Sequence, residues 1–481
     1  METESMFRGT KIVATLGPAS NNLETLQQMI AAGVNVARLN FSHGKPEDHI
    51  GRAQMIRQAA DNVGTCVGIL ADLQGPKIRV GKFADGSIML VKGATFVLDA
   101  ECELGNQDTV GLDYKDLPND VAAGAVLLLD DGKIVLDVDR VEGAKIFTTV
   151  RVGGKLSNNK GINQQGGGLS APALTDKDKE DLKTAVALQA DYIAVSFPKN
   201  AADMNEAREL VKAAGGHALL VAKIERCEAI DKLEEILDAT DGIMVARGDL
   251  AVEVGDAAVP ALQKRMIRMA RERNKFVITA TQMMESMISS PVPTRAEVSD
   301  VANAVLDGTD AVMLSAETAA GEYPVETVEA MARVCVAAEQ SYANSFDIEL
   351  LNREQHQVDQ SIAMATLFTA QHIKVKAIAA LTQSGSTALW MSRVDSGVPI
   401  YAVTPEETTR RKVSVFRDVF PMKTDAIATT REAALAQAER ALLDAGAVEK
   451  GDLVLMTVGE QMGKPGATNN MLIVRVGELQ P

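Results

Sequence analysis

Eight short apolar segments, each followed by a polar or helix-like stretch, constrain the fold of this 481-residue chain more than any other feature. They are the runs 11–16, 34–39, 66–71, 191–196, 218–222, 242–245, 276–280 and 311–314. Strands that alternate with helices form parallel βα units, and eight such units close a (β/α)8 (TIM) barrel. Polar or glycine-containing sequence follows each segment, as expected for loops that gather at one mouth of the barrel.

The barrel pattern is interrupted after its third segment. Residues 74–167 contain short alternating apolar runs at 126–129, 134–138 and 146–152, which predict hairpins. We therefore expect a β-barrel lid domain at 74–167, inserted into a barrel domain formed by 1–73 and 168–345. Its glycine-containing connections, 74–79 and 161–168, flank the barrel mouth, which suggests a moving lid. A rigid inserted module is an equal alternative.

The remainder of the chain, residues 346–481, shows a second α/β pattern. Apolar runs at 376–381, 399–404, 453–459 and 471–476 are separated by helical stretches such as 431–445. We expect a C-terminal α/β domain, with its boundary near 346–357.

Composition bounds the class of protein. Apolar residues make up 46% of the chain, and no apolar run reaches the roughly 20 residues of a membrane span. The N-terminus lacks a basic segment followed by an apolar one, which favours the cytoplasm. Four scattered cysteines fit reduced thiols. The net charge of −16 argues against a nucleic-acid partner.

Ionisable residues stand at the ends of two neighbouring apolar segments. Because side chains alternate along a strand, Lys223 and Glu225 face one side and Ile224 faces the other. Asp249 follows the next segment, beside Gly248. Two carboxylates from adjacent strand ends suit Mg²⁺, although an ordinary ion pair and a turn would give the same short motifs.

Longer sequence motifs stand at the ends of the predicted strands. TKIVATLGPAS, RLNFSHG, DLQGPKIR, AKIE, DGIMVARGDL, TATQMMES and MLSAET resemble the pyruvate kinase family, in the same order and with the same insertion. The resemblance implies transfer of the phosphoryl group of phosphoenolpyruvate to ADP, followed by protonation of the enolate to pyruvate. Two alternatives are a metal-dependent lyase or aldolase on a similar barrel, and a catalytically silent metabolite sensor.

The resemblance implies roles in handling the phosphoryl group. Glu225 and Asp249 would hold Mg²⁺ or Mn²⁺, Arg38 would anchor the phosphate, and Lys223 would neutralise it during transfer. The backbone of Gly248 and Asp249 would bind the substrate carboxylate.

The resemblance also implies positions for proton delivery and for ADP. Thr281 would lie near the methylene carbon of the enolate, with Ser315 in a water relay. Nucleotide contacts are expected from Arg79, His43 and Asn40. The family's acidic position near the lid's return is Ser170 here, and the basic position after the fourth strand is Lys199 or its neighbour, so nucleotide contacts there stay open.

A monovalent-cation site is implied at the ends of the second and third strands, at Asn40, Ser42, Asp72 and Leu73. Members that need K⁺ have an acidic residue where this chain has Lys77. A fixed ammonium there would supply the missing charge and would repel a second cation, since like charges ~4 Å apart repel by about 4 kcal/mol at an effective dielectric of 20. We therefore expect no K⁺ requirement.

In the C-terminal domain the resemblance implies an allosteric site for a phosphorylated effector, either a sugar phosphate or AMP. Its residues would be Thr382, Ser384, Gly385, Ser386 and Thr387, with the loop 464–469 closing over them. A helix N-cap is the plain alternative reading of the same residues. A homotetramer is implied by the resemblance alone.

Overall fold

The structure of the protein is a computed structural model. It describes residues 7–341, 357–424, 428, 430–460 and 466–479. Within these residues eight parallel strands close a barrel in the order β1-β18-β17-β16-β15-β14-β3-β2. They are β1 (Lys11–Thr15), β2 (Val36–Asn40), β3 (Gly68–Asp72), β14 (Tyr192–Val195), β15 (Leu219–Ile224), β16 (Gly242–Ala246), β17 (Phe276–Ala280) and β18 (Ala311–Leu314). Each overlaps a predicted apolar segment, so the predicted (β/α)8 barrel is confirmed.

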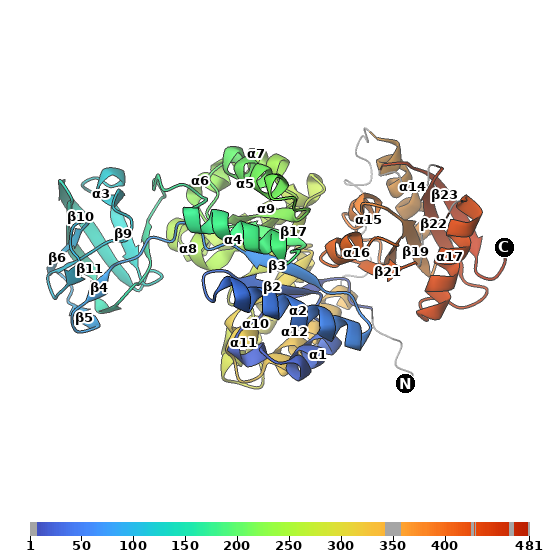
Figure 1. Ribbon diagram of the computed structural model, residues 1–481, viewed down its shortest axis with the longest axis horizontal. Helices are drawn as coiled ribbons and strands as arrows, with labels where there is room; N and C mark the ends of the chain where they lie inside the picture. The colour runs from blue at the N-terminus through green and yellow to red at the C-terminus, as the bar shows by residue number, and fades with distance from the viewer. Residues whose placement is uncertain (1–6, 342–356, 425–427, 429, 461–465, 480–481) are drawn as a thin grey trace.

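Helices surround the strands on the outside (Figure 1). The principal ones are α1 (Leu23–Ala32), α2 (Pro46–Val63), α4 (Asp176–Ala187), α5 (Ala201–Ala213), α7 (Leu233–Ala239), α9 (Val259–Glu272), α10 (Arg295–Leu306) and α12 (Pro324–Ser341). Shorter helices follow three strand ends: α6 (Cys227–Asp231), α8 (Arg247–Val254) and α11 (Ala316–Ala319).

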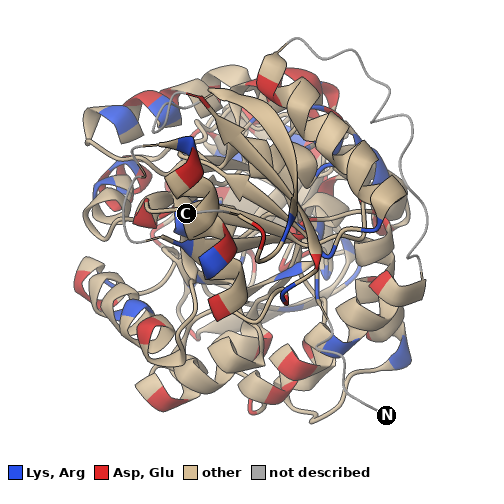
Figure 2. Ribbon diagram, turned by 90° about the vertical axis from the view of Figure 1, so that its right-hand side faces the viewer, with Lys and Arg blue, Asp and Glu red and all other residues tan. Residues whose placement is uncertain are grey.

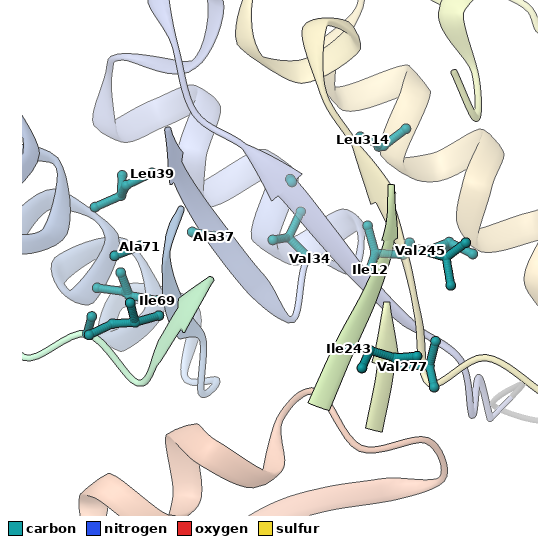
Figure 3. Packing of buried hydrophobic residues seen from close by; sticks show 14 of the residues in the cluster. Ile12, Val34, Ala37, Leu39, Ile69, Ala71, Ile243, Val245, Val277 and Leu314 are labelled. Carbon is teal, nitrogen blue, oxygen red and sulfur yellow. The ribbon is translucent and has the colours of Figure 1, made fainter. Parts of the chain in front are cut away.

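Alternation along the strands divides the buried side chains into two sets. Ile12, Ala71 and Ile224 point outward and pack with the helices, in the cluster that Figure 3 shows from close by. Val13 and Val221 belong to a second cluster, which begins inside the barrel and continues into the C-terminal domain. Burying each large side chain stabilises the fold by about 1.5–3 kcal/mol. Since Ile224 is outward, the side chains on either side of it in sequence face the barrel interior.

The start of α4 fastens the outgoing connection of the inserted domain. Thr175 and Asp178 form a capping box, in which Asp178 N donates to Thr175 Oγ1 at 3.1 Å and Thr175 N donates to Asp178 Oδ2 at 2.9 Å. The other oxygen, Asp178 Oδ1, accepts from Gly75 N at 3.0 Å. One helix cap therefore also places the chain that leaves the barrel after β3.

The inserted part is built of short strands around its own apolar core, at the left of Figure 1. A six-stranded sheet has the order β13-β9-β10-β11-β6-β8, and two-stranded sheets pair β12 with β5 and β4 with β7. Its elements are β4 (Lys82–Phe83), β5 (Ser87–Leu90), β6 (Thr95–Asp99), β7 (Leu104–Gly105), β8 (Thr109–Val110), α3 (Leu117–Asp120), β9 (Val126–Leu129), β10 (Ile134–Glu142), β11 (Lys145–Val152), β12 (Gly154–Ser157) and β13 (Ile162–Gln164).

The C-terminal part is the predicted α/β domain. Its described strands form a sheet in the order β21-β20-β19-β22-β23, with β23 antiparallel to β22. Its elements are α14 (Val358–Ile373), β19 (Ala377–Leu381), α15 (Ser386–Met391), β20 (Ile400–Thr404), α16 (Glu407–Val413), β21 (Val419–Lys423), α17 (Arg431–Asp444), β22 (Leu453–Gly459) and β23 (Thr468–Arg475). Most of the expected boundary at 346–357 lies outside the described residues.

One strand of this sheet, β21, was not among the predicted segments. Its sequence contains Pro421, and a proline weakens the reading of a short run as a strand. In the sheet β21 is an edge strand, where a missing N–H is tolerated.

Buried ion pairs join the base of the barrel to the C-terminal domain. Asp310, just before β18, accepts from Arg393 through both carboxylate oxygens and from Arg417 N at 2.9 Å. Asp191, just before β14, accepts from Arg411 Nε at 2.8 Å. These contacts lie at the end of the barrel opposite to the strand ends that carry the predicted site residues.

On the side of the C-terminal domain, acidic and basic residues are interspersed over the helices (Figure 2). The described helices include none that is long and apolar enough to cross a membrane. The four cysteines are all unpaired, as predicted.

The Arg393–Asp310 pair predicts a large stability effect. Arg393→Ala should lower the free energy of unfolding by about 3–5 kcal/mol, because it leaves the Asp310 carboxylate buried without its main counter-charge. Urea denaturation followed by circular dichroism would measure it. The control Lys183→Ala removes an exposed ion pair with Glu180 and should change stability by less than about 0.5 kcal/mol. A loss below about 1 kcal/mol for Arg393→Ala, the value of an exposed pair, would contradict this account.

Candidate active site

The centre of the candidate site is the ammonium group of Lys223, near the end of β15. Its Nζ donates to Ser196 Oγ at 2.7 Å and lies 3.0 Å from Glu225 Oε1 and 3.3 Å from Asp72 Oδ1. These partners stand at the ends of β14, β15 and β3. Burial alone would lower the pKa of Lys223, but the charges of Asp72 and Glu225 outweigh it and raise the pKa. Lys223 therefore stays cationic.

A second cation, Arg38, approaches the same carboxylate from β2. Its Nε donates to Asp72 Oδ2 at 2.7 Å and its Nη1 donates to Thr15 Oγ1 at 3.0 Å. Burial opposes ionisation of Asp72, yet the charges of Lys223 and Arg38 hold the pKa of this carboxyl below its usual value. Asp72 Oδ1 is buried, and its one polar neighbour among the described residues is Lys223 Nζ, at 3.3 Å. An oxygen in this state can accept a further cation.

Glu225 is almost fully buried, and its orientation is set by backbone. Its Oε2 accepts from Phe197 N at 2.9 Å. Phe197 has a φ of +56°, a left-handed conformation that a bulky residue adopts only under strain. Burial, together with the nearby charges of Asp249 and Asp72, raises the pKa of Glu225 to about 6, although Lys223 opposes the shift.

Asp249 lies in the first turn of α8, which begins directly after β16. Its Oδ1 is 3.4 Å from Lys77 Nζ. No group of three or more His, Cys, Asp or Glu side chains in the described part of the chain could hold a metal by itself. The carboxylates of Glu225 and Asp249, from adjacent strand ends, nevertheless fit Mg²⁺, which usually takes one or two protein carboxylates and completes its shell with water and substrate oxygens.

Thr281 closes the site on the side of β17. It has a φ of +70°, and its Oγ1 accepts from Gly248 N at 2.9 Å. Arg247 fixes this turn, because its Nη2 donates to Thr281 O at 2.6 Å and its Nη1 pairs with Asp300. The N–H of Gly248, predicted to bind a substrate carboxylate, is therefore held by Thr281 in this structure.

A cavity of about 680 Å³ opens between the barrel mouth and the inserted domain. The barrel contributes predicted site residues to its wall: Gly248, Asp249, Thr281 and Ser315. The connection that leaves the barrel after β3 contributes Lys77. The inserted domain contributes Leu128, Asp131, Gly132 and Gln165. Ser315 is set by its own N–H, which donates to Glu317 Oε2 at 2.6 Å. Lys223 and Glu225 are not part of the wall; Asp249 lies in it and acts electrostatically on Glu225.

Arg79 lies where the two connections of the inserted domain run side by side. It bridges to Gly161, and its Nη1 donates to Asn159 O at 3.0 Å. The adjoining Lys160 pairs with Asp130 at 2.7 Å, on the hairpin turn next to the cavity residue Asp131. Arg79 and Lys160 thus form a pair of cations at this junction.

Lys199 and Ser170, the two positions at which the sequence left nucleotide contacts open, make hydrogen bonds within the protein. Lys199 Nζ donates to Ser170 O at 3.1 Å and to Ala171 O at 3.2 Å. Ser170 N donates to Asp120 Oδ2 at 2.9 Å. These contacts fasten the return connection of the inserted domain.

The predicted monovalent-cation residues surround Asp72. Asn40 Oδ1 accepts from Ser42 N at 3.1 Å, and Leu73 O accepts from Ser196 Oγ at 2.7 Å. Lys77 extends to Asp249. His43, in the same loop, is exposed.

The predicted effector residues form the turn between β19 and α15. Gly385 N donates to Thr382 Oγ1 at 2.9 Å, and Ser384 Oγ lies 3.0 Å from Ser386 Oγ. Thr387 Oγ1 lies 3.1 Å from Thr468 Oγ1, at the end of the expected closing loop. The first residues of that loop, 464 and 465, lie outside the described residues.

Sequence reasoning missed several residues that shape the site. Ser196 and Thr15 hold the two cations, Phe197 holds Glu225, Arg247 holds Thr281, and Lys160 stands beside Arg79. The position of Ser196 directly after an apolar strand was a usable signal. The partners of the others depend on the turns of loops.

The fold and the Lys223 cluster indicate a class of enzyme. A closed (β/α)8 barrel with buried cations and carboxylates at its strand ends, beside an inserted domain, is a framework of enzymes, which carry their active sites at this face of the barrel. Residues 7–328 match the family "Pyruvate kinase, barrel domain", and residues 360–474 match "Pyruvate kinase, alpha/beta domain".

Full-length relatives agree. The chain is 53% identical to pyruvate kinase of Haemophilus influenzae, over 95% of this chain and 96% of that protein. It is 53% identical to pyruvate kinase II of Salmonella typhimurium (98% and 99%) and 44% identical to pyruvate kinase of Mycobacterium intracellulare (98% and 99%). The chain belongs to the pyruvate kinase family, a family of ATP-forming phosphotransferases.

Proposed function

We propose that the protein transfers the phosphoryl group of phosphoenolpyruvate to ADP and protonates the resulting enolate to pyruvate. The observation that supports this most is the Lys223 cluster, in which two cations and two buried carboxylates converge beside a cavity that the inserted domain covers. Phosphoryl transfer needs positioning and charge neutralisation rather than covalent help. Family membership favours this reaction over the lyase, aldolase and sensor alternatives.

In this proposal Arg38 anchors the phosphate and Lys223 neutralises its oxygens during transfer. Glu225 and Asp249 hold Mg²⁺ or Mn²⁺, which supplies Lewis-acid stabilisation of the phosphate oxygens when bound. The start of α8, at Gly248 and Asp249, receives the substrate carboxylate once Thr281 Oγ1 releases the Gly248 N–H.

Thr281 and Ser315 support proton delivery to the methylene carbon of the enolate, because both line the cavity. A water held between them completes the relay. Since Arg247 pins the strained turn at Thr281, the backbone of Thr281 is already in place before substrate binds, and its hydroxyl becomes free when it releases the Gly248 N–H.

ADP enters from the junction of the inserted domain. Arg79 and the adjoining Lys160 bind its phosphates as two cations, while Asn40, at the end of β2, and His43, in the following loop, also contact the nucleotide. Asp130 holds Lys160 in place before the nucleotide arrives.

Regulation, assembly and location complete the proposal. A phosphorylated effector, a sugar phosphate or AMP, binds the hydroxyl-rich turn from Thr382 to Thr387, and Thr468 places the closing loop beside it. We further propose a cytoplasmic homotetramer, with domains at 1–73 plus 168–345, 74–167 and 346–481.

Pyruvate release coupled to a dehydrogenase tests the reaction. The wild-type protein should release pyruvate only when ADP and a divalent ion are present, whereas a lyase would turn over without nucleotide. Lys223→Met should lower kcat by at least about a hundredfold, since one preorganised donor is worth ~3 kcal/mol. The control Lys212→Met removes an exposed lysine that pairs with Glu209 and should retain full activity. Near-full activity of a folded Lys223→Met protein would remove Lys223 from its role.

The position of Lys77 predicts activity without K⁺. Its ammonium, 3.4 Å from Asp249, supplies a positive charge at the mouth that K⁺ would otherwise provide. The same assay at constant ionic strength, with tetramethylammonium in place of K⁺, should give unchanged activity, and Lys77→Glu should introduce a K⁺ requirement. Strict K⁺ dependence of the wild-type enzyme would refute the proposal.

A further inference from the structure

The return connection of the inserted domain is held to the barrel at consecutive glycines. Gly166 N donates to Glu253 O at 3.2 Å, and Gly168 N donates to Glu228 Oε1 at 2.6 Å. Gly167 has a φ of +79°, and a Cβ at this position would lie 2.8 Å from Glu228 Oε1. The Glu228 carboxylate therefore rests directly on backbone that only glycine allows.

Both glutamates belong to helices that begin beside the candidate metal carboxylates. Glu228 is in α6, three residues after Glu225, and Glu253 is in α8, about one turn after Asp249. Glu253 Oε2 accepts from Cys227 N at 2.9 Å, which ties α8 to the start of α6. The two helices are thus linked to each other and to the same connection.

The contact of Glu228 with the connection is its principal polar contact. Oε1 accepts from Gly168 N, while Oε2 is buried without a hydrogen-bond partner among the described residues. A buried carboxylate oxygen without a partner is costly. The unpartnered oxygen of Glu228 is explained if the carboxylate serves to hold the glycine backbone through its other oxygen.

We propose that Glu228, together with Glu253, forms a clamp that couples the position of the inserted domain to the setting of Glu225 and Asp249. Both clamp glutamates are positioning residues, since they act through the metal carboxylates and touch no substrate. Because only two residues separate Glu228 from Glu225, a shift of the connection is transmitted to the end of β15. The inference rests on the proposed function in taking Glu225 and Asp249 as metal ligands.

Two variants test the clamp in the full-length protein. In Glu228→Ala, amide hydrogen exchange at 166–168 should rise about tenfold or more, because a charge-assisted hydrogen bond is lost. The dissociation constant for Mn²⁺, measured by electron paramagnetic resonance without nucleotide, should rise about tenfold, as for the loss of an outer partner of a metal ligand. Glu228→Gln keeps an oxygen acceptor and should restore most of both values.

Glu209→Ala is the control, because it removes an exposed carboxylate on α5 and should change neither value. Faster exchange in Glu228→Ala with unchanged Mn²⁺ affinity would overturn the coupling, and unchanged exchange would overturn the clamp. Failure of the wild-type protein to bind Mn²⁺ would instead contradict the proposed function. Circular dichroism establishes that each variant is folded before the comparison is made.

Discussion

The ammonium group of Lys223 is the interaction on which the site depends. It lies within 3.3 Å of two almost fully buried carboxylates, Asp72 and Glu225, and without it Glu225 would lose its counter-charge in a low-dielectric interior. Arg38 adds a second positive charge on Asp72. An acidic protein of net charge −16 thereby keeps two cations, Lys223 and Arg38, fixed at the mouth of the barrel, where they can meet an anionic substrate.

The barrel supplies this centre by geometry. Parallel strands bring their carboxyl ends to one rim, and the alternation of side chains turns Lys223 and Glu225 inward while Ile224 packs outward. The inserted domain then covers the rim and contributes Asp131 and Gly132 to the cavity. Contacts at the opposite end, such as Asp310 with Arg393, fix the C-terminal domain without touching the site. One end of the barrel thus carries the candidate active site, and the opposite end binds the C-terminal domain.

The sequence predicted the features that depend on the alternation of side chains along strands and on the order of the apolar segments. The eight strands, the second α/β domain and the shared face of Lys223 and Glu225 follow from alternation, which is a property of the strand itself. The roles assigned to the individual site residues stay predictions. The sequence did not predict the partners of these residues, since they depend on loop conformation. Neither the left-handed backbone of Phe197 nor the ion pair of Lys77 with Asp249 has a sequence signal, and the clamp at Glu228 depends on how three glycines turn.

The most direct test of the account is the position of the divalent ion. Anomalous diffraction from crystals soaked in Mn²⁺ and phosphoenolpyruvate should show a peak in contact with a carboxylate oxygen of both Glu225 and Asp249, at about 2.1 Å, the range of a hard divalent ion. Lys223 should then face the phosphate oxygens. A peak elsewhere, with no density between these two carboxylates, would contradict the claim that this strand-end cluster is the phosphoryl-transfer centre.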